Sequence, residues 1–185
     1  MNMLTSEELV DSIKSRIGKL KVVKLTEILQ KEQFSVHDLI DITFSENRDI
    51  AFRAAWLLEN LFLQKPAAYI DEIEYLVSRI KDVKHPSCKR HYAKIMMHVT
   101  AAKAPEAIRK KLEAIDLEPV VEQFFDWLID AKVLVAVKVF AVGALFNVRS
   151  RYPWMAGELK DQIQFMLRDG TAAMQSRGRK LLAQL

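Results

Sequence analysis

The zinc-binding residue types histidine and cysteine gather in one short stretch of the chain, at His85, Cys88, His91 and His98. Cys88 and His91 are three residues apart, so a helix would place both on one face. His98 lies seven residues beyond His91, which is about 10 Å along a helix axis. A structural zinc site needs four ligands in a tetrahedron, and no second pair of Cys or His residues completes one. We therefore expect no metal site and no cofactor.

The sequence carries none of the short motifs that mark the common enzyme classes. There is no G-x-G-x-x-G, no Walker A loop, no G-x-S-x-G and no H-E-x-x-H. The helical lyases of the fumarase and adenylosuccinate lyase superfamily need a much longer chain and an S-S-x-M-P-x-K-x-N loop, and neither is present. We predict no catalytic residue and expect a protein that is not an enzyme.

Arg53 and Lys138 are single cations within otherwise apolar segments that superimpose on one another. A buried charge requires a partner, so the structural interpretation pairs each cation with an acid at the end of the preceding or a neighbouring helix. The alternative is direct contact with a ligand. We favour the structural role for both residues.

A second group of cations is the candidate binding surface. Lys89, Arg90 and Lys94 share one predicted helix, and Arg177 and Arg179 lie on the last one. A positive surface attracts acidic protein segments or a phosphate backbone. The competing interpretation is an ordinary solvated face.

The three tryptophans, Trp56, Trp127 and Trp154, have two interpretations. Each could stack on a nucleic-acid base, but helical spacing more often places such residues in a core. We predict core positions for Trp56 and Trp127.

The elements that position these residues are predicted to be helices throughout. Val120, Val121, Phe124, Phe125 and Leu128 follow helical spacing, and only five Gly and five Pro interrupt the chain. About ten helices are expected, in about five pairs. The formal net charge of +4 conceals alternation between two classes of segment. The acidic segments are 5–15, 35–46, 67–81, 117–130 and 153–168, and the apolar or basic ones are 18–33, 48–64, 85–103, 131–151 and 169–185.

An internal repeat underlies this alternation. Arg53, Lys89, Lys138 and Arg177 recur at intervals of 36, 49 and 39 residues, and the longest interval contains an insertion near 105–116. Paired helices repeating roughly every 40 residues are typical of an α-solenoid. The stretch Asn47–Leu58 reads apolar-Ala-apolar-Arg-Ala-Ala-x-Leu-Leu after an Asn- and Asp-bearing turn.

This pattern resembles the HEAT repeat family and its armadillo relatives, over residues 35–185. The resemblance implies an all-α superhelix in a single domain, 1–185, with residues 1–33 as an N-terminal capping pair. It also implies that the second helix of each repeat lines a concave face, which would gather the candidate cations in one groove. We therefore expect a scaffold that binds an extended, acidic protein partner. The alternative is a nucleic-acid-binding protein related to the HEAT-like DNA glycosylases for alkylated bases, none of whose catalytic residues can be matched here.

The remaining expectations concern location and assembly. A single cysteine cannot form an intramolecular disulfide, and the acidic start of the chain does not resemble a signal peptide. The most apolar stretch, Val133–Phe146, is shorter than the roughly 20 residues that span a bilayer, so we predict a buried core helix. We expect a cytoplasmic protein with no membrane partner. Self-association through Leu181, Leu182 and Leu185 of the last helix is a further alternative.

Overall fold

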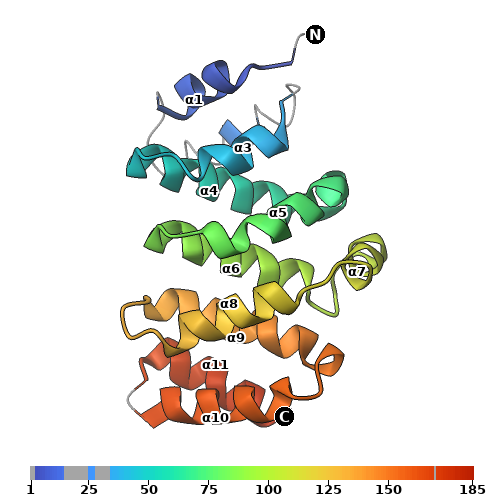
Figure 1. Ribbon diagram of the computed structural model, residues 1–185, viewed down its shortest axis with the longest axis vertical. Coiled ribbons are helices and arrows are strands. Elements are labelled where there is room, and N and C mark those ends of the chain that lie inside the picture. Colours follow the sequence, from blue (N-terminus) through green and yellow to red (C-terminus); the bar gives the residue numbers. More distant parts are fainter. Residues whose placement is uncertain (1–2, 15–24, 28–33, 169) are drawn as a thin grey trace. The chain divides into compact units, whose positions relative to one another are not determined.

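The computed structural model describes residues 3–14, 25–27, 34–168 and 170–185. Every regular element within these ranges is a helix and none is a strand, which confirms the predicted all-α fold class (Figure 1). The chain divides into two compact units, Met1–Tyr92 and Ala93–Leu185, and the division falls inside one helix, α6 (Pro86–Val99). The single domain 1–185 stays a prediction.

The first unit is built from paired helices that pack on one another. α3 (Val36–Ile42) packs on α4 (Arg48–Gln64), and α1 (Ser6–Lys14) contacts both. Side chains start two of these helices: Ser35 accepts a hydrogen bond from the amide of Asp38, and Asn47 accepts from Asp49 and Ile50. Further helices in the described part of this unit are η1 (Pro66–Glu72), α5 (Ile73–Arg79), η2 (Ile80–Asp82) and the start of α6.

The N-terminal capping pair falls partly outside the described residues. Its first predicted helix corresponds to α1, whose Leu9 and Ile13 are buried. Of the second predicted helix, 18–33, only residues 25–27 are described, and Leu25 is buried there.

The second unit consists of the end of α6 and five further α-helices. α8 (Glu118–Ile129) packs on α9 (Val135–Val148), and α9 also contacts α10 (Met155–Arg168) and α11 (Ala172–Leu182). A short 3-10 helix, η3 (Arg149–Arg151), follows α9. The insertion predicted near 105–116 contains its own helix, α7 (Glu106–Glu113).

Helix α9 is the core helix of the second unit. Val137 and the run from Ala141 to Phe146 are all buried, because three neighbouring helices cover this apolar segment. The predicted core position of Trp127 is confirmed at 2% exposure, whereas Trp56 is only half-buried. Among the described residues, no helix is long and apolar enough to cross a membrane.

Candidate functional site

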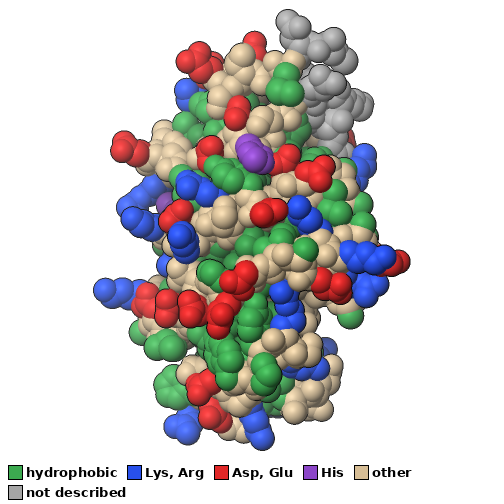
Figure 2. Space-filling view, turned by 45° about the vertical axis from the view of Figure 1, so that its right-hand side comes forward, with side chains coloured by type: hydrophobic (Ala, Val, Ile, Leu, Met, Phe, Trp, Pro, Cys, Tyr) green, Lys and Arg blue, Asp and Glu red, His purple; other side chains and the backbone are tan. Residues whose placement is uncertain are grey.

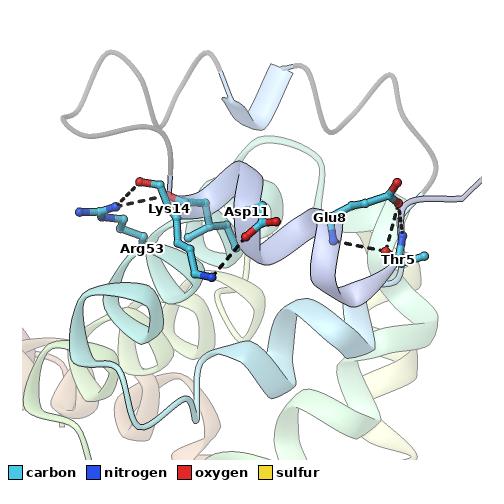
Figure 3. A network of polar contacts seen from close by, with 6 residues as sticks. Thr5, Glu8, Asp11, Lys14 and Arg53 are labelled. Atoms are coloured by element: carbon cyan, nitrogen blue, oxygen red, sulfur yellow. Dashed lines mark hydrogen bonds and ion pairs between the residues drawn. The ribbon is translucent and has the colours of Figure 1, made fainter.

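Arg53 caps the C-terminal end of helix α1. Its Nη1 donates to the carbonyl oxygens of Ile13 at 3.3 Å and Lys14 at 3.0 Å, the last two residues of α1 (Figure 3). The carbonyls at a helix C-terminus lack intrahelical donors and carry the negative end of the helix dipole. A cation placed there donates hydrogen bonds to these carbonyls and interacts favourably with the dipole. Arg53 therefore links α4 to α1.

Lys138 caps the C-terminal end of α8 in the second unit. Its Nζ donates to the carbonyl oxygen of Leu128 at 2.8 Å, one residue before the end of α8. Burial lowers the pKa of the Lys138 ammonium, and the negative charge of Asp130 opposes that shift. The hydrogen bonds of Arg53 and Lys138 thus go to helix-terminal carbonyls, whereas an acidic side chain was predicted as the partner. Asp130 contributes to Lys138 through its charge alone.

A third cation repeats this arrangement outside the predicted set. Arg151 donates through Nη1 to the carbonyl of Leu112 and through Nη2 to that of Ile115, each at 2.9 Å. These carbonyls lie at the end of α7 and in the turn that follows. In both units, therefore, cations donate hydrogen bonds to main-chain carbonyls at helix C-termini.

The candidate binding cations on α6 lie near the surface. Lys89, Arg90 and Lys94 are all half-buried, and Lys94 Nζ stands 5.9 Å from the centroid of the Phe140 ring. Arg90 forms no ion pair or hydrogen bond within the described part of the chain. No acidic residue occurs in α6, so its positive charge is not neutralised on its own helix.

The two candidate cations of α11 differ in their surroundings. Arg179 is exposed and donates to Gln175 Oε1 at 2.9 Å. Arg177 is half-buried, and its Nη2 lies 3.0 Å from Met97 Sδ. Gly143 makes room for this packing, since a Cβ there would lie 2.6 Å from both Arg177 Nη2 and Met97 Sδ. Lys89 and Arg90 belong to the first unit and the other three cations to the second. A groove that unites all five stays a prediction.

His91 and Cys88 are buried and serve packing. His91 is fully buried, and its Nδ1 lies 2.6 Å from Glu59 Oε2, which is also buried. The Cys88 thiol donates to the Thr43 carbonyl at 3.7 Å, and burial raises its pKa to about 12, so it remains protonated. Burial first, and the charges of Lys103 and Lys94 second, lower the pKa of His98. Within the described ranges no group of three His, Cys, Asp or Glu side chains is arranged to hold a metal ion.

A cavity in the first unit was not predicted from the sequence. It has a volume of about 700 Å³ and lies between the α3–α4 loop and the loop that joins η2 to α6. Its charged lining residues are Arg48, Arg79, Lys84, Glu46 and Asp82, with His85 beside them. Lys and Arg side chains gather along the left-hand edge of Figure 2, at the height where α4 and α6 begin in Figure 1. The basic stretch before α6 is a sequence signal, but the facing α3–α4 loop is about 40 positions away and only the fold reveals it.

The second unit has a smaller cavity of more apolar character. Its volume is about 250 Å³, and it lies between the α8–α9 loop and the α10–α11 loop. Val135 and Phe165 line it and are exposed at 40% and 66%. Lys138 and Arg168 are the cations in its wall.

The fold agrees with a comparison against known families. A family model described as a HEAT repeat domain matches residues 9–185. No curated protein and no solved structure matches the chain. HEAT repeats generally mediate protein–protein interaction and are typically non-catalytic. Since the match covers nearly all of this all-helical chain, the protein belongs to the HEAT repeat domain family.

Proposed function

We propose that this chain is a non-catalytic interaction module that binds an extended, acidic segment of a protein partner. Lys89, Arg90 and Lys94 on α6 are the proposed contacts, together with the exposed Arg179. Half-buried Arg177, next to Met97, adds positive charge.

The observation that carries this proposal is the positive charge of α6, which no acidic residue on the same helix balances. The helix holds three half-buried basic side chains and no acidic one, and Arg90 has no polar partner within the described residues. Charge complementarity of this kind steers association and selects partners more than it adds affinity. A sequence rich in Asp or Glu is the partner chemistry that such a helix fits.

An acidic protein segment fits this surface better than nucleic acid does. Glu118, Glu122 and Asp126 of α8 are exposed and follow one another at four-residue steps, so they share one helix face, and Asp130 at the C-cap is exposed too. Red side chains form a row at the height of α8 in Figure 2. This acidic row repels a phosphate backbone from the exposed face of α8.

Peptide binding tests the proposal directly. Fluorescence anisotropy would compare a labelled peptide rich in Glu and Asp with a neutral peptide of equal length and with duplex DNA. We expect the acidic peptide to bind, and we expect Arg90→Glu to weaken that binding by roughly tenfold. Lys160→Glu, an exposed charge reversal on α10, is the matched control and should bind as the unmodified protein does.

Two outcomes would contradict the proposal. One is equal binding of acidic and neutral peptides. The other is tight DNA binding that weakens log-linearly as salt is raised, which is the behaviour of a phosphate-backbone reader.

A further inference from the structure

The 700 Å³ cavity of the first unit has the dimensions and the chemistry of a binding pocket. Pockets for small groups typically occupy about 300–1,000 Å³ and combine an apolar surface with a few convergent polar groups. Here Phe44, Val83 and Pro86 supply apolar wall, and three cations and a histidine stand around it. Neither the fold family nor the proposed α6 contacts assign a role to this cavity.

Part of the pocket wall is held rigidly. The Arg79 guanidinium lies 4.4 Å from the centroid of the Phe44 ring and pairs with Asp82 at 3.3 Å. On the floor, the Cys88 thiol is bonded to the carbonyl of Thr43. A preorganised wall of this kind lowers the entropy lost when a ligand is bound.

Other donors of the pocket have no partner. Arg79 Nε and His85 Nδ1 are inaccessible to solvent and lack a hydrogen bond. Arg48 and Lys84 form no ion pair within the described residues, although both line the cavity. An acceptor that enters the pocket can reach Arg48 and Lys84, which are exposed, and form charge-assisted hydrogen bonds with them.

We infer that this pocket receives an Asp or Glu side chain of the acidic segment proposed above, so that Arg48, Lys84 and His85 surround its carboxylate. The inference rests on the proposed function and names a second contact of the same partner. It extends the binding surface from α6 back to the loop that precedes it and to the start of α4.

The charge of the lining favours a carboxylate over a phosphate. Three cations face two acids, Glu46 and Asp82, so the pocket has an excess of one positive charge when His85 is neutral. A carboxylate carries one negative charge and balances this excess. A phosphate group carries close to two at neutral pH and would also approach Glu46. The apolar wall suits the aliphatic stem of a Glu side chain.

His85 provides a direct signal of occupancy. Burial first, and the positive charge of Arg48 second, lower its pKa, so the ring is neutral in the empty pocket at neutral pH. The charged groups that face it are Arg48, Lys84, Arg79, Glu46 and Asp82. An incoming carboxylate favours the protonated ring, so peptide binding takes up a proton and raises the pKa of His85. Affinity for the peptide should therefore be higher at pH 5.5 than at pH 7.5.

The test combines binding with NMR of the histidine rings. Arg48→Glu is the principal variant, because an acidic residue at the first position of α4 suits the helix dipole and should not unfold the helix. We expect it to weaken binding of the Glu-rich peptide by roughly tenfold, and Lys84→Gln by about threefold. Lys65→Gln, another exposed cation of the first unit, is the control and should leave affinity unchanged. The peptide should shift the His85 ring resonances and leave those of exposed His37 in place.

Each failure has its own signature. If Arg90→Glu weakens binding but Arg48→Glu and the His85 resonances show no response, the pocket assignment is wrong and the proposed function stands. If no acidic peptide binds the unmodified protein, both are wrong. If inorganic phosphate shifts His85 more strongly than the peptide does at equal concentration, the carboxylate assignment is wrong.

Discussion

Each unit has a cavity between the loop within one helix pair and the loop within the following pair. The two cavities differ in character. In the first unit, Arg48 at the start of α4, Arg79 at the end of α5 and Lys84 in the loop before α6 stand around a cavity of about 700 Å³. In the second, exposed Val135 and Phe165 line a cavity of about 250 Å³. The packing of the helices creates the cavity, and the side chains at the helix ends and in the loops decide its chemistry. The binding properties of such a chain must therefore be inferred from the side chains of its loops and helix surfaces.

The interiors of the two units also differ in polarity. The first unit buries a His91–Glu59 pair and a hydrogen bond between Thr43 and Tyr92. The second is organised around α9, whose buried residues are apolar apart from Gly143. Polar interior groups must keep their partners, whereas an apolar interior depends on shape alone. The first unit should therefore be more sensitive to the loss of single polar groups.

The largest expected effect is the loss of the buried pair. Glu59→Ala leaves fully buried His91 without this carboxylate, and we expect the free energy of unfolding to fall by about 3 kcal/mol. Chemical denaturation measures the change. Glu122→Ala removes an exposed carboxylate of α8 and should change stability by less than about 0.5 kcal/mol. Equal losses of stability in the two variants would contradict a stabilising role of the buried Glu59–His91 pair.

The next effect concerns the helix-closing cations. Arg53→Ala removes hydrogen bonds to two carbonyls and should cost about 2 kcal/mol, and Lys138→Ala removes one and should cost about 1.5 kcal/mol. Arg53→Met should cost less than Arg53→Ala, because it keeps the packing of the aliphatic stem. Thermal and chemical unfolding of the three variants would test this order. Negligible losses in both Arg53 variants would contradict a structural role.

A smaller effect depends on pH and compares one histidine from each unit. The pKa of His85 and that of His98 are both lowered, chiefly by burial, and then by Arg48 for His85 and by Lys103 and Lys94 for His98. A lowered histidine pKa means that the folded state binds fewer protons than the unfolded state, so stability falls as pH drops below about 6.5. His85→Gln and His98→Gln should each reduce this fall. A steeper loss of stability on acidification in either variant would contradict the sign.

The smallest effect is expected at the apolar cavity. Phe165 is 66% exposed, so Phe165→Ser should change the free energy of unfolding by less than about 0.5 kcal/mol. It should also reduce binding of a hydrophobic fluorescent dye, since it removes apolar surface beside Val135. Calorimetry and a dye titration would check both expectations. A loss above about 2 kcal/mol would show that Phe165 packs in the core.

Sequence periodicity was sufficient for the fold and for much of the core. The apolar run Val133–Phe146 predicted a buried helix, and α9 is that helix. The segment 67–81, predicted as one helix, instead runs through η1, α5 and the start of η2, and the backbone departs from helical geometry at Tyr69 within η1, with φ −122° and ψ 27°. Periodicity reports which face is apolar and not where the backbone bends.

The partners of the cations were harder to predict. Arg53 and Lys138 were recognised as structural charges, but their hydrogen-bond acceptors are main-chain carbonyls, which no side-chain pattern reveals. The basic cavity escaped prediction because two loops distant in sequence form it. Such long-range juxtapositions arise from tertiary packing and leave no local signal.

The most direct test of the account is one titration. A labelled Glu-rich peptide would be titrated into the unmodified protein, into the double variant Arg48→Glu/Arg90→Glu and into the control Lys65→Gln/Lys160→Gln. The account predicts binding by the unmodified protein and the control, and a loss of roughly 100-fold in the double variant if the two sites contribute independently. Unchanged affinity in the double variant would contradict the claim that the basic surface at the start of α4 and along α6 binds an acidic partner.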